Sequence, residues 1–423
     1  AETADPDYPV GSYYIYNVGE RLFLAGGENW GAHTVLAYAS NAFRLIATDS
    51  DGNPLEKGFR IQTMRPNGTE GINDFINYGS YVDCNTNEAW EFVPVEGKTN
   101  VFNIVRAGGN AEDGYVMLGY RDGKDNAFTL SYNVVDTDMK TATSEANQWM
   151  LISKKELDEM MAKATSDNPV AATHLIVNPG FDQRLTIENW STDIVGGTDE
   201  NPGFGLGVWD RNANHPDFAY EAWNCQTGST TQTIFDDAIQ PGWYALTAQI
   251  YYREGRFEDH AAKYVAGEPL ARNAFLTIGD GDENVNGEIP LITDYANQVP
   301  GLGRLDATGT VRFSDGCACT TEDYFQSGCY WSKPVFFEVT EANKGMLVIG
   351  FTKTASVNYD WVVADNFRLT YYGAQPPTAI EGVQESVAPW QQGGTAIYNL
   401  QGQRLSGTQK GVNIINGRKV MVK

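Results

Sequence analysis

The sequence predicts an all-β chain of several domains. Short stretches that alternate apolar and polar residues, as half-buried strands do, recur along most of its 423 residues. The 44 glycines, with frequent Asn and Asp, are typical of tight turns between short strands. Because the chain is too long for one ordinary core, we expect two large domains and a small third one.

Charge restricts the classes of partner. The chain has 30 basic and 54 acidic residues, a formal net charge of −24 at pH 7. This excess disfavours nucleic acid and anionic lipid surfaces, because both need a basic counter-surface. A neutral glycan, a divalent cation or a basic partner remains compatible with it. No run approaches the roughly 20 apolar residues of a transmembrane segment.

The chain start and the cysteines bear on the compartment. The polar start at residues 1–5, without Met, resembles a mature terminus after signal removal, although a boundary chosen for expression would look the same. Five cysteines cannot all pair within one chain. We expect one local disulfide within a close-spaced group and two lone buried thiols. The group is Cys317, Cys319 and Cys329, and the lone thiols are Cys84 and Cys225.

Residues 1–152 contain three similar stretches. Ile15 and Ile61 lie 46 residues apart, and Ile61 and Ile104 lie 43 apart, a spacing typical of structural repeats. Each stretch ends in a strand with a central aromatic residue, at 41–46, 88–93 and 147–152. Three units of about four strands each would close into a barrel with a triangular cap, because no unit can bury its own apolar face.

The last of these strands is similar to a known family motif. Gln148-Trp149 resembles the Gln-x-Trp strand of ricin-type β-trefoil lectins, although the intervening residue is missing and the first unit has Phe43. The resemblance implies a β-trefoil-like domain over residues 1–152. The motif's Trp is a core residue in that family, and its ligand Asp has no match here. The resemblance therefore implies the fold and no sugar site.

Residues 153–169 are predicted to form a helical linker. Ser153 and Glu156 have the spacing of a capping box, and Asn168-Pro169 ends the helix. One apolar stripe follows the helical period and consists of Leu157, Met160, Met161 and Ala164. We expect this stripe to pack on a neighbouring domain, which makes the helix a strut or a hinge.

Residues 170–375 return to a β pattern. Four segments, at 175–182, 232–234, 241–253 and 361–370, resemble in their order the galactose-binding-like jelly-roll family. That family includes many carbohydrate-binding modules, and the variant resembled here is common in secreted proteins of Bacteroidetes. The resemblance spans the whole domain and implies a jelly-roll β-sandwich. It concerns the fold more than the ligand.

The same resemblance implies a structural calcium ion. In related modules the first and last strands lie side by side, and Ca²⁺ joins them through carboxylates. Asp182 and Asp365 match those positions in kind, although each could cap a turn instead. Residues 280–287 look like a calcium loop at the first three ligands, but Val285 stands where glycine is needed. We interpret them as an acidic hairpin loop.

Sugar binding needs a flat aromatic face and amides or carboxylates for the hydroxyl groups. Such residues gather in the loop-rich stretch 203–224 and again around residues 324–331. Trp209 is the first choice, because Gly205 and Gly207 beside it imply a loop. The candidate ligand-binding residues are Trp209, Asp210, Arg211, Asn212, Tyr220, Trp223 and Trp331.

The end of the chain has its own pattern. Residues 376–394 are rich in Pro, Gln, Glu and Gly and are interpreted as a linker. Residues 395–423 contain alternating strands and a strong hairpin signal at Asn416-Gly417. They resemble the C-terminal sorting domain of the type IX secretion pathway in Bacteroidetes, which implies export and surface attachment. A small β-appendage without a sorting role is the alternative.

Together these patterns predict a non-catalytic glycan-binding protein that is secreted or held on the outer-membrane surface of a bacterium. The alternative is a structural or adhesive envelope protein that assembles with itself or with other envelope proteins. A glycoside hydrolase needs only a pair of carboxylates, so a cryptic pair is a third hypothesis. No zinc-protease His spacing, nucleophile elbow or phosphate-binding loop occurs, so we expect no enzyme.

Overall fold

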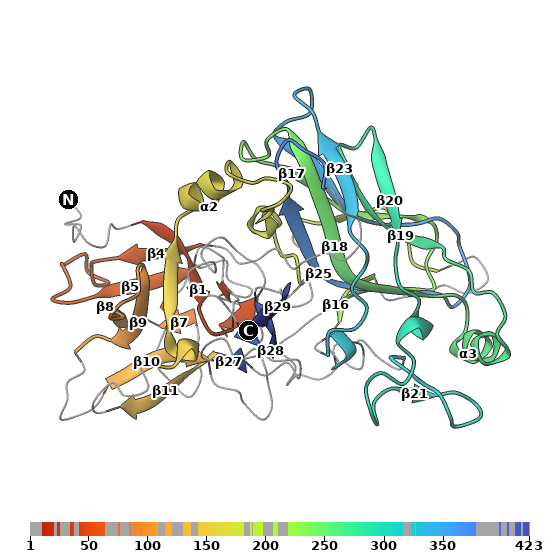
Figure 1. Ribbon diagram of the computed structural model, residues 1–423, viewed down its shortest axis with the longest axis horizontal. Coiled ribbons are helices and arrows are strands. Elements are labelled where there is room, and N and C mark those ends of the chain that lie inside the picture. The colour runs from red at the N-terminus through yellow and green to blue at the C-terminus, as the bar shows by residue number, and fades with distance from the viewer. Residues whose placement is uncertain are drawn as a thin grey trace.

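The computed structural model describes a β-barrel, a helix and a β-sandwich in chain order, followed by a small sheet (Figure 1). The described residues are 11–20, 23–25, 34–37, 42–63, 75–76, 84–86, 88–108, 115–120, 130–136, 143–181, 187, 189–197, 206–209, 219–315, 321, 323–325, 327–377, 397–398, 404–405, 411–415 and 418–422. Within them, helices are few and the sheets are antiparallel, which confirms the predicted all-β class. No helix among these residues is long and apolar enough to cross a membrane.

Six strands of the N-terminal region form a closed ring, in which each strand pairs with two neighbours. In ring order they are β1 (Ser12–Asn17), β4 (Phe43–Ile46), β5 (Phe59–Thr63), β8 (Ala89–Pro94), β9 (Val101–Arg106) and β12 (Trp149–Ile152). A hairpin pairs with each of β1, β5 and β9. The hairpins are β2 (Phe23–Ala25) with β3 (Val35–Ala37), β6 (Phe75–Ile76) with β7 (Cys84–Thr86), and β10 (Tyr115–Tyr120) with β11 (Leu130–Asp136). This threefold arrangement agrees with the repeats in the sequence.

The barrel core consists of the residues that define the repeat. Ile15, Ile61 and Ile104 are fully buried in one cluster, together with Trp90 and Trp149. Each tryptophan donates its ring N–H to a backbone carbonyl of a hairpin strand, at 3.3 Å for Trp90 and 2.9 Å for Trp149. Because the rings are buried and their polar atoms are satisfied within the fold, both are core residues, as expected.

Helix α2 (Lys154–Met161) follows the barrel. Ser153 Oγ accepts a hydrogen bond from the Glu156 N–H, and Glu156 accepts one from the Ser153 N–H, which confirms the capping box. Leu157 packs in a cluster with barrel residues, whereas Met161 belongs to the sandwich core. The helix therefore contacts both large units. It ends earlier than the pattern predicts, because a turn around residues 165–168 follows it.

Two sheets form the sandwich. The six-stranded sheet has the order β15 (Leu206–Trp209), β16 (Ala219–Trp223), β25 (Trp361–Tyr371), β18 (Gly242–Arg253) and β23 (Val335–Val339), and β13 (Val170–Ala171) also pairs with β25. The five-stranded sheet has the order β14 (Ser191–Thr192), β17 (Gly228–Phe235), β24 (Met346–Lys353), β19 (Ala274–Gly279) and β20 (Asn284–Glu288). The largest apolar cluster draws on inward residues of both sheets. This is the jelly-roll-like sandwich that the sequence predicts.

A cover segment packs on the outer face of the six-stranded sheet, on the side away from the sandwich core. We define it as residues 254–266, which include α3 (Phe257–Ala266), and the described residues between 291 and 330. The second part contains a 3-10 helix (Ile292–Tyr295), β21 (Arg304–Leu305) and β22 (Arg312–Phe313). Its apolar residues form one cluster with Ala219, Tyr251, Trp361 and Val363 of the sheet. The cover thus buries part of a sheet face that would otherwise meet solvent.

Three smaller predictions have outcomes here. The acidic stretch is a hairpin loop, because Asp280 Oδ1 accepts hydrogen bonds from the N–H groups of Asp282 and Glu283 between β19 and β20. Cys225 is a lone buried thiol, as expected. Cys329 is also a free thiol, so a local disulfide that includes it is not formed. Its side chain is instead buried in the apolar cluster between the cover and the sheet. Residues 317 and 319 lie outside the described residues, and only the backbone of Cys84, on β7, is described.

The C-terminal strands form a separate four-stranded sheet. Its order is β27 (Arg404–Leu405), β26 (Ile397–Tyr398), β28 (Gly411–Ile415) and β29 (Arg418–Val422). The register pairs Ile415 with Arg418 across residues 416–417, so the hairpin predicted at Asn416-Gly417 is present. The linker at 376–394 falls almost entirely outside the described residues. The sorting role and the domain boundaries stay predictions.

Candidate functional site

The outer face of the six-stranded sheet is defined by strand alternation. On the central strand β18, Tyr244, Leu246 and Ile250 point into the sandwich core, so Trp243, Thr247 and Tyr251 point outward. On β25 the register shifts opposite Thr247 and Gln249, and Asn366 has a positive φ of 51°. Because of this bulge, Ala364 before it and Phe367 after it both point into the sandwich core. The outward residues of β25 and its extension are Trp361, Val363, Asp365, Arg368, Thr370 and Tyr372.

One half of this outer face lies under the cover segment. Tyr251 is fully buried, and its ring centroid lies 4.7 Å from that of Tyr330 and 5.6 Å from that of Trp361. The Trp361 N–H donates to buried Glu221 at 2.8 Å. An ion pair of 3.3 Å joins Arg253 of the sheet to Asp315 of the cover, and both are buried. This half is an internal interface and offers no surface to a ligand.

Among the residues that the structure describes, no segment packs over the other half in this way. We call this half the open face. Pairing places Trp243 between Glu338 and Tyr372, Ala245 between Phe336 and Thr370, and Thr247 beside Arg368. Gln249 lies between Asp365 and Trp331 at the boundary with the cover. The open face consists of Trp243, Thr247, Trp331, Phe336, Glu338, Arg368 and Thr370, and the buried Tyr372 lies at its edge.

Aromatic and polar side chains alternate on the open face. Trp243, Trp331 and Phe336 are half-buried, so each keeps part of its ring in solvent. The Phe336 and Tyr372 rings meet edge to face at 5.6 Å, and the Arg368 guanidinium lies 4.0 Å from the Trp331 ring centroid. Trp331 pairs with Gln249 of β18, which lies six residues, or about 20 Å, along the strand from Trp243. The face is therefore longer than a single sugar ring.

The floor at the Trp331 end is held by buried polar groups. Gln249 donates to the backbone carbonyls of Phe325 and Cys329 at 2.7 and 2.9 Å. The Asp365 carboxylate is buried and accepts hydrogen bonds from the backbone and side-chain amides of Asn366 at 2.6 and 2.7 Å. Asp365 thus holds the bulge within β25, and whether it also binds a metal stays open. Asp182 lies outside the described residues, and these contain no cluster of metal-binding side chains. The calcium pair stays a prediction.

The sequence-predicted sugar residues fall into different places. The backbone of Trp209 pairs with Ala219, at the same end of the sheet as Asp365 and Trp331. The three residues after it, Asp210, Arg211 and Asn212, lie outside the described residues. Trp223 is half-buried at the opposite end of β16. The candidates therefore do not form one site, although two of them lie at one end of the sheet.

Tyr220 was predicted to contact a ligand, and its position contradicts this. Its side chain is fully buried in the sandwich core, with ring centroids 5.4 Å from Phe181 and 5.6 Å from Phe351. Its hydroxyl accepts a hydrogen bond from Thr230, and burial raises its pKa. The physical reason is alternation. The stretch taken for a loop contains strand β16, on which residue 220 points inward.

The residues of the open face that the sequence did not indicate are Trp243, Phe336 and Arg368. The alternation of Trp243 with Tyr244 was visible in the sequence. Both faces of this strand carry aromatic residues, however, so the pattern does not say which face meets solvent. Only the position of the cover segment decides that.

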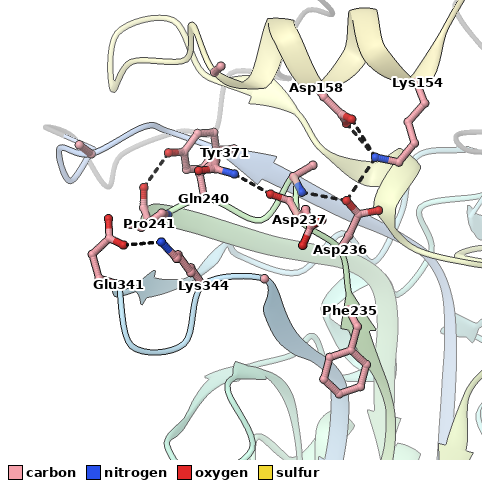
Figure 2. A pocket seen from close by; sticks show the side chains of 14 residues that line it. Lys154, Asp158, Phe235, Asp236, Asp237, Gln240, Pro241, Glu341, Lys344 and Tyr371 are labelled. Carbon is pink, nitrogen blue, oxygen red and sulfur yellow. Dashed lines mark hydrogen bonds and ion pairs between the residues drawn. The ribbon is translucent and has the colours of Figure 1, made fainter.

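An open cleft of about 1240 Å³ lies elsewhere, between α2 and the turn that joins β17 to β18 (Figure 2). The Lys154 ammonium lies 2.8 Å from Asp158 and 3.2 Å from Asp236, so it joins the helix to the sandwich. Glu341 and Lys344 form another ion pair at 2.9 Å. Since much of its charge is paired internally and its exposed ring, Phe235, stands alone, we interpret the cleft as a structural junction.

Comparisons with known proteins identify no family for this chain. No family model matches the sequence, and the curated proteins include no match. Among solved structures, the carbohydrate-binding module TmCBM61 in complex with β-1,4-galactotriose is similar, with 14% identity and a TM-score of 0.24. The match covers 47% of this chain and 97% of that chain.

Two further structures are similar over about the same share of the chain. The enzymatically active domain of tailspike protein 4 of bacteriophage CBA120 has 14% identity and a TM-score of 0.23, over 46% of this chain and 21% of that chain. The Stig cyclase Fisc from Fischerella sp. TAU, in complex with an indole compound, has 19% identity and a TM-score of 0.27, over 49% and 100%. At these values the likeness says nothing about the ligand or reaction of this chain.

Proposed function

We propose that this chain is a non-catalytic glycan-binding protein of the bacterial cell surface, and that it binds a glycan chain on the open face. The observation that carries the proposal is the contrast within one sheet face. Under the cover, aromatic rings are fully buried, whereas on the open face Trp243, Trp331 and Phe336 remain partly exposed. Burial would stabilise such rings, so exposed ones on a sheet face indicate a surface for a partner.

The chemistry of the open face suits a sugar. Exposed ring faces can stack on the apolar C–H side of a pyranose. Thr247, Thr370, Arg368 and Glu338 lie between the rings and supply donors and acceptors for hydroxyl groups. A neutral ligand also avoids the repulsion that a net charge of −24 imposes on polyanions.

Among the described residues, the carboxylate of the open face and the nearest one beside it support binding without hydrolysis. Glycoside hydrolases place two carboxyl groups about 5 to 9.5 Å apart. Glu338 pairs with Trp243 of β18, and Asp365 pairs with Gln249 of β18. Trp243 and Gln249 are six residues apart along that strand. That separation is about 20 Å. Asp365 is also buried at the bulge of β25.

The test is retention of the full chain on a panel of soluble and insoluble polysaccharides. We expect binding to a subset of neutral glycans, with affinity at least about tenfold weaker in Trp243→Ala and in Trp331→Ala, since each ring contributes about 1.4 kcal/mol. Phe235→Ala is the matched control, because this ring is 75% exposed but lies on the other sheet. Absence of binding to every glycan, or equal binding by the variants, would overturn the proposal.

Export is the second part of the proposal. The hairpin of β28 and β29 and the resemblance of residues 395–423 to a sorting domain support it. Deletion of these residues should move the protein from the cell surface to the periplasm of a type IX-competent host, as followed by cell fractionation. Unchanged surface delivery of the truncated chain would contradict this part and leave glycan binding untouched.

A further inference from the structure

A second aromatic cluster lies at the opposite end of the six-stranded sheet, at the edge of the cover segment. Trp223 ends β16, Tyr359 lies in the loop before β25, and Arg256 directly precedes α3. The Arg256 guanidinium lies 3.6 Å from the Tyr359 ring centroid, and the Trp223 and Tyr359 rings are 6.0 Å apart at an angle of 58°. We call these three residues the end clamp. Both rings are half-buried and Arg256 is exposed.

The backbone that carries Tyr359 is strained and held on both sides. Its φ is +66°, a region that a bulky aromatic residue seldom adopts. Asn224 Oδ1 accepts a hydrogen bond from the Tyr359 N–H at 2.6 Å, and the Arg253 guanidinium donates to the Tyr359 carbonyl at 3.2 Å. Such strain persists only where the surroundings impose it, and here two side chains do so. The backbone of Tyr359 is therefore held in one conformation, and its ring contacts Arg256 and Trp223.

A buried ion pair lies beneath the loop. Lys353 and Asp360 are both fully buried, and the Lys353 ammonium lies 2.7 Å from the Asp360 carboxylate. The Tyr252 hydroxyl donates to the same carboxylate at 3.1 Å, and Lys353 also donates to the Cys225 carbonyl at 2.6 Å. Burial raises the pKa of Asp360 to about 6, although the ammonium lowers it. A polar network of this kind gives the loop a rigid base.

Arg256 differs from the neighbouring arginines in its ion pairing. Arg253 and Arg304 both form ion pairs with Asp315. No carboxylate lies within ion-pair distance of Arg256 in the part of the chain that the structure describes. A guanidinium stacked on a ring keeps the N–H groups at its edge available, and these match the two oxygens of a carboxylate.

We propose that the end clamp binds the carboxylate of a uronic acid residue, with Arg256 paired to the carboxylate and Trp223 against the sugar ring. The inference rests on the proposed glycan binding and adds a second, charge-selective site. Gln249 and Arg253, the β18 residues at the two edges of the covered half, are four residues apart, about 13 Å along the strand. The clamp is thus separate from the open face.

Short oligomers are the right probes, because the net charge of −24 repels long polyanions. The full chain is titrated calorimetrically at 0.15 M salt with trimers of galacturonic, glucuronic and mannuronic acid, and with their neutral methyl esters. The variants are Arg256→Gln, which removes the charge, and Tyr359→Asn, because Asn tolerates a positive φ. Arg304→Gln is the matched control, since Arg304 also stacks on a ring, that of Phe257 at 4.2 Å, but is paired with carboxylates.

We expect at least one acid trimer to bind at least about tenfold more tightly than its ester, and Arg256→Gln and Tyr359→Asn to abolish this preference. Arg304→Gln should keep it. Equal affinity for acids and esters in the wild type, or a preference that survives Arg256→Gln, would overturn the clamp. Loss of neutral-glycan binding in Trp243→Ala reports separately on the open face. The two proposals can therefore fail independently.

Discussion

The two halves of the outer face of the six-stranded sheet come from the same strands, yet their aromatic residues have different roles. Tyr251 and Trp243 both point outward from β18, eight residues apart. Tyr251 is fully buried against Tyr330 and Trp361, whereas Trp243 keeps part of its ring in solvent. The difference arises from the cover segment, which follows β18 in the chain and folds back over one half only.

This contrast shows that residue type and strand position do not by themselves identify a binding residue. An outward aromatic residue serves the core where another segment covers it and is available to a ligand where none does. Four substitutions or conditions test the contrast, from the largest expected effect to the smallest.

Tyr251→Ala should lower the free energy of unfolding by about 3 to 5 kcal/mol, the usual cost of removing a buried aromatic ring. The ring packs under the cover, and its hydroxyl lies 2.7 Å from Thr321 Oγ1. The measurement is urea denaturation of the full chain, followed by fluorescence. A cost below about 1 kcal/mol would mean that the cover does not bury this half in solution.

Acid should weaken the cover through His260. This side chain is buried on α3, and neither ring nitrogen has a hydrogen-bond partner within the described residues. Burial lowers the pKa of His260 from 6.5 to about 4. The positive charges of Arg253 and Lys263 also lower it, whereas Glu254 raises it. Between pH 6.5 and pH 4, His260 is protonated in the unfolded chain but stays neutral in the folded chain. Stability from this group is therefore complete above pH 6.5 and falls by about 3 kcal/mol as the pH decreases to 4.

Asp360 acts in the opposite direction over part of the same range. Its pKa is raised to about 6 in the folded state, so the folded chain binds an extra proton there as the pH falls. The measured quantity is therefore the difference in unfolding free energy between the wild type and His260→Gln at pH 7 and pH 4. This difference should shift by about 3 kcal/mol against the wild type in acid. A difference that does not change with pH would contradict the assignment to His260.

Trp243→Ala should cost only about 1 kcal/mol of stability, because the ring is half-buried. Its effect on glycan affinity should be the larger one, as described for the open face. The informative result is the ratio to Tyr251→Ala in the same denaturation series. Equal costs for the two rings would show that the open face is covered in solution.

Lys154→Ala should have the smallest effect, at most about 1 kcal/mol. Its ammonium pairs with Asp158 and Asp236, but these side chains are 47%, 34% and 25% exposed, and solvent screens such pairs. The loss should shrink further at 1 M salt, and glycan binding should not change. A loss of glycan binding would identify the cleft in Figure 2 as part of a ligand site.

Much of the fold could be predicted because local patterns define it. The spacing of Ile15, Ile61 and Ile104 predicted the threefold barrel, and all three are buried in its core. Ser153 and Glu156 predicted the start of α2, because a capping box needs only residues three apart. The hairpins at residues 280–287 and 411–422 followed from turn residues between short strands.

The candidate site was predicted only in part. Trp331 lies on the open face, whereas Tyr220 is a core residue and Trp223 belongs to the other end of the sheet. The stretch 203–224 was interpreted as a loop because glycine, asparagine and aspartate dominate it. Those residues frame strands β15 and β16, whose alternation decides which side chains point outward.

By itself the sequence determined the all-β class, the threefold repeat, the capped helix and the hairpin turns, because each depends on residues close together in the chain. Only the tertiary structure decided which half of the outer sheet face is open. Both faces of β18 carry aromatic residues, and the segment that covers one half contributes residues up to 330, almost 80 positions after the strand ends. Solvent exposure depends on such distant contacts, and no local pattern records them.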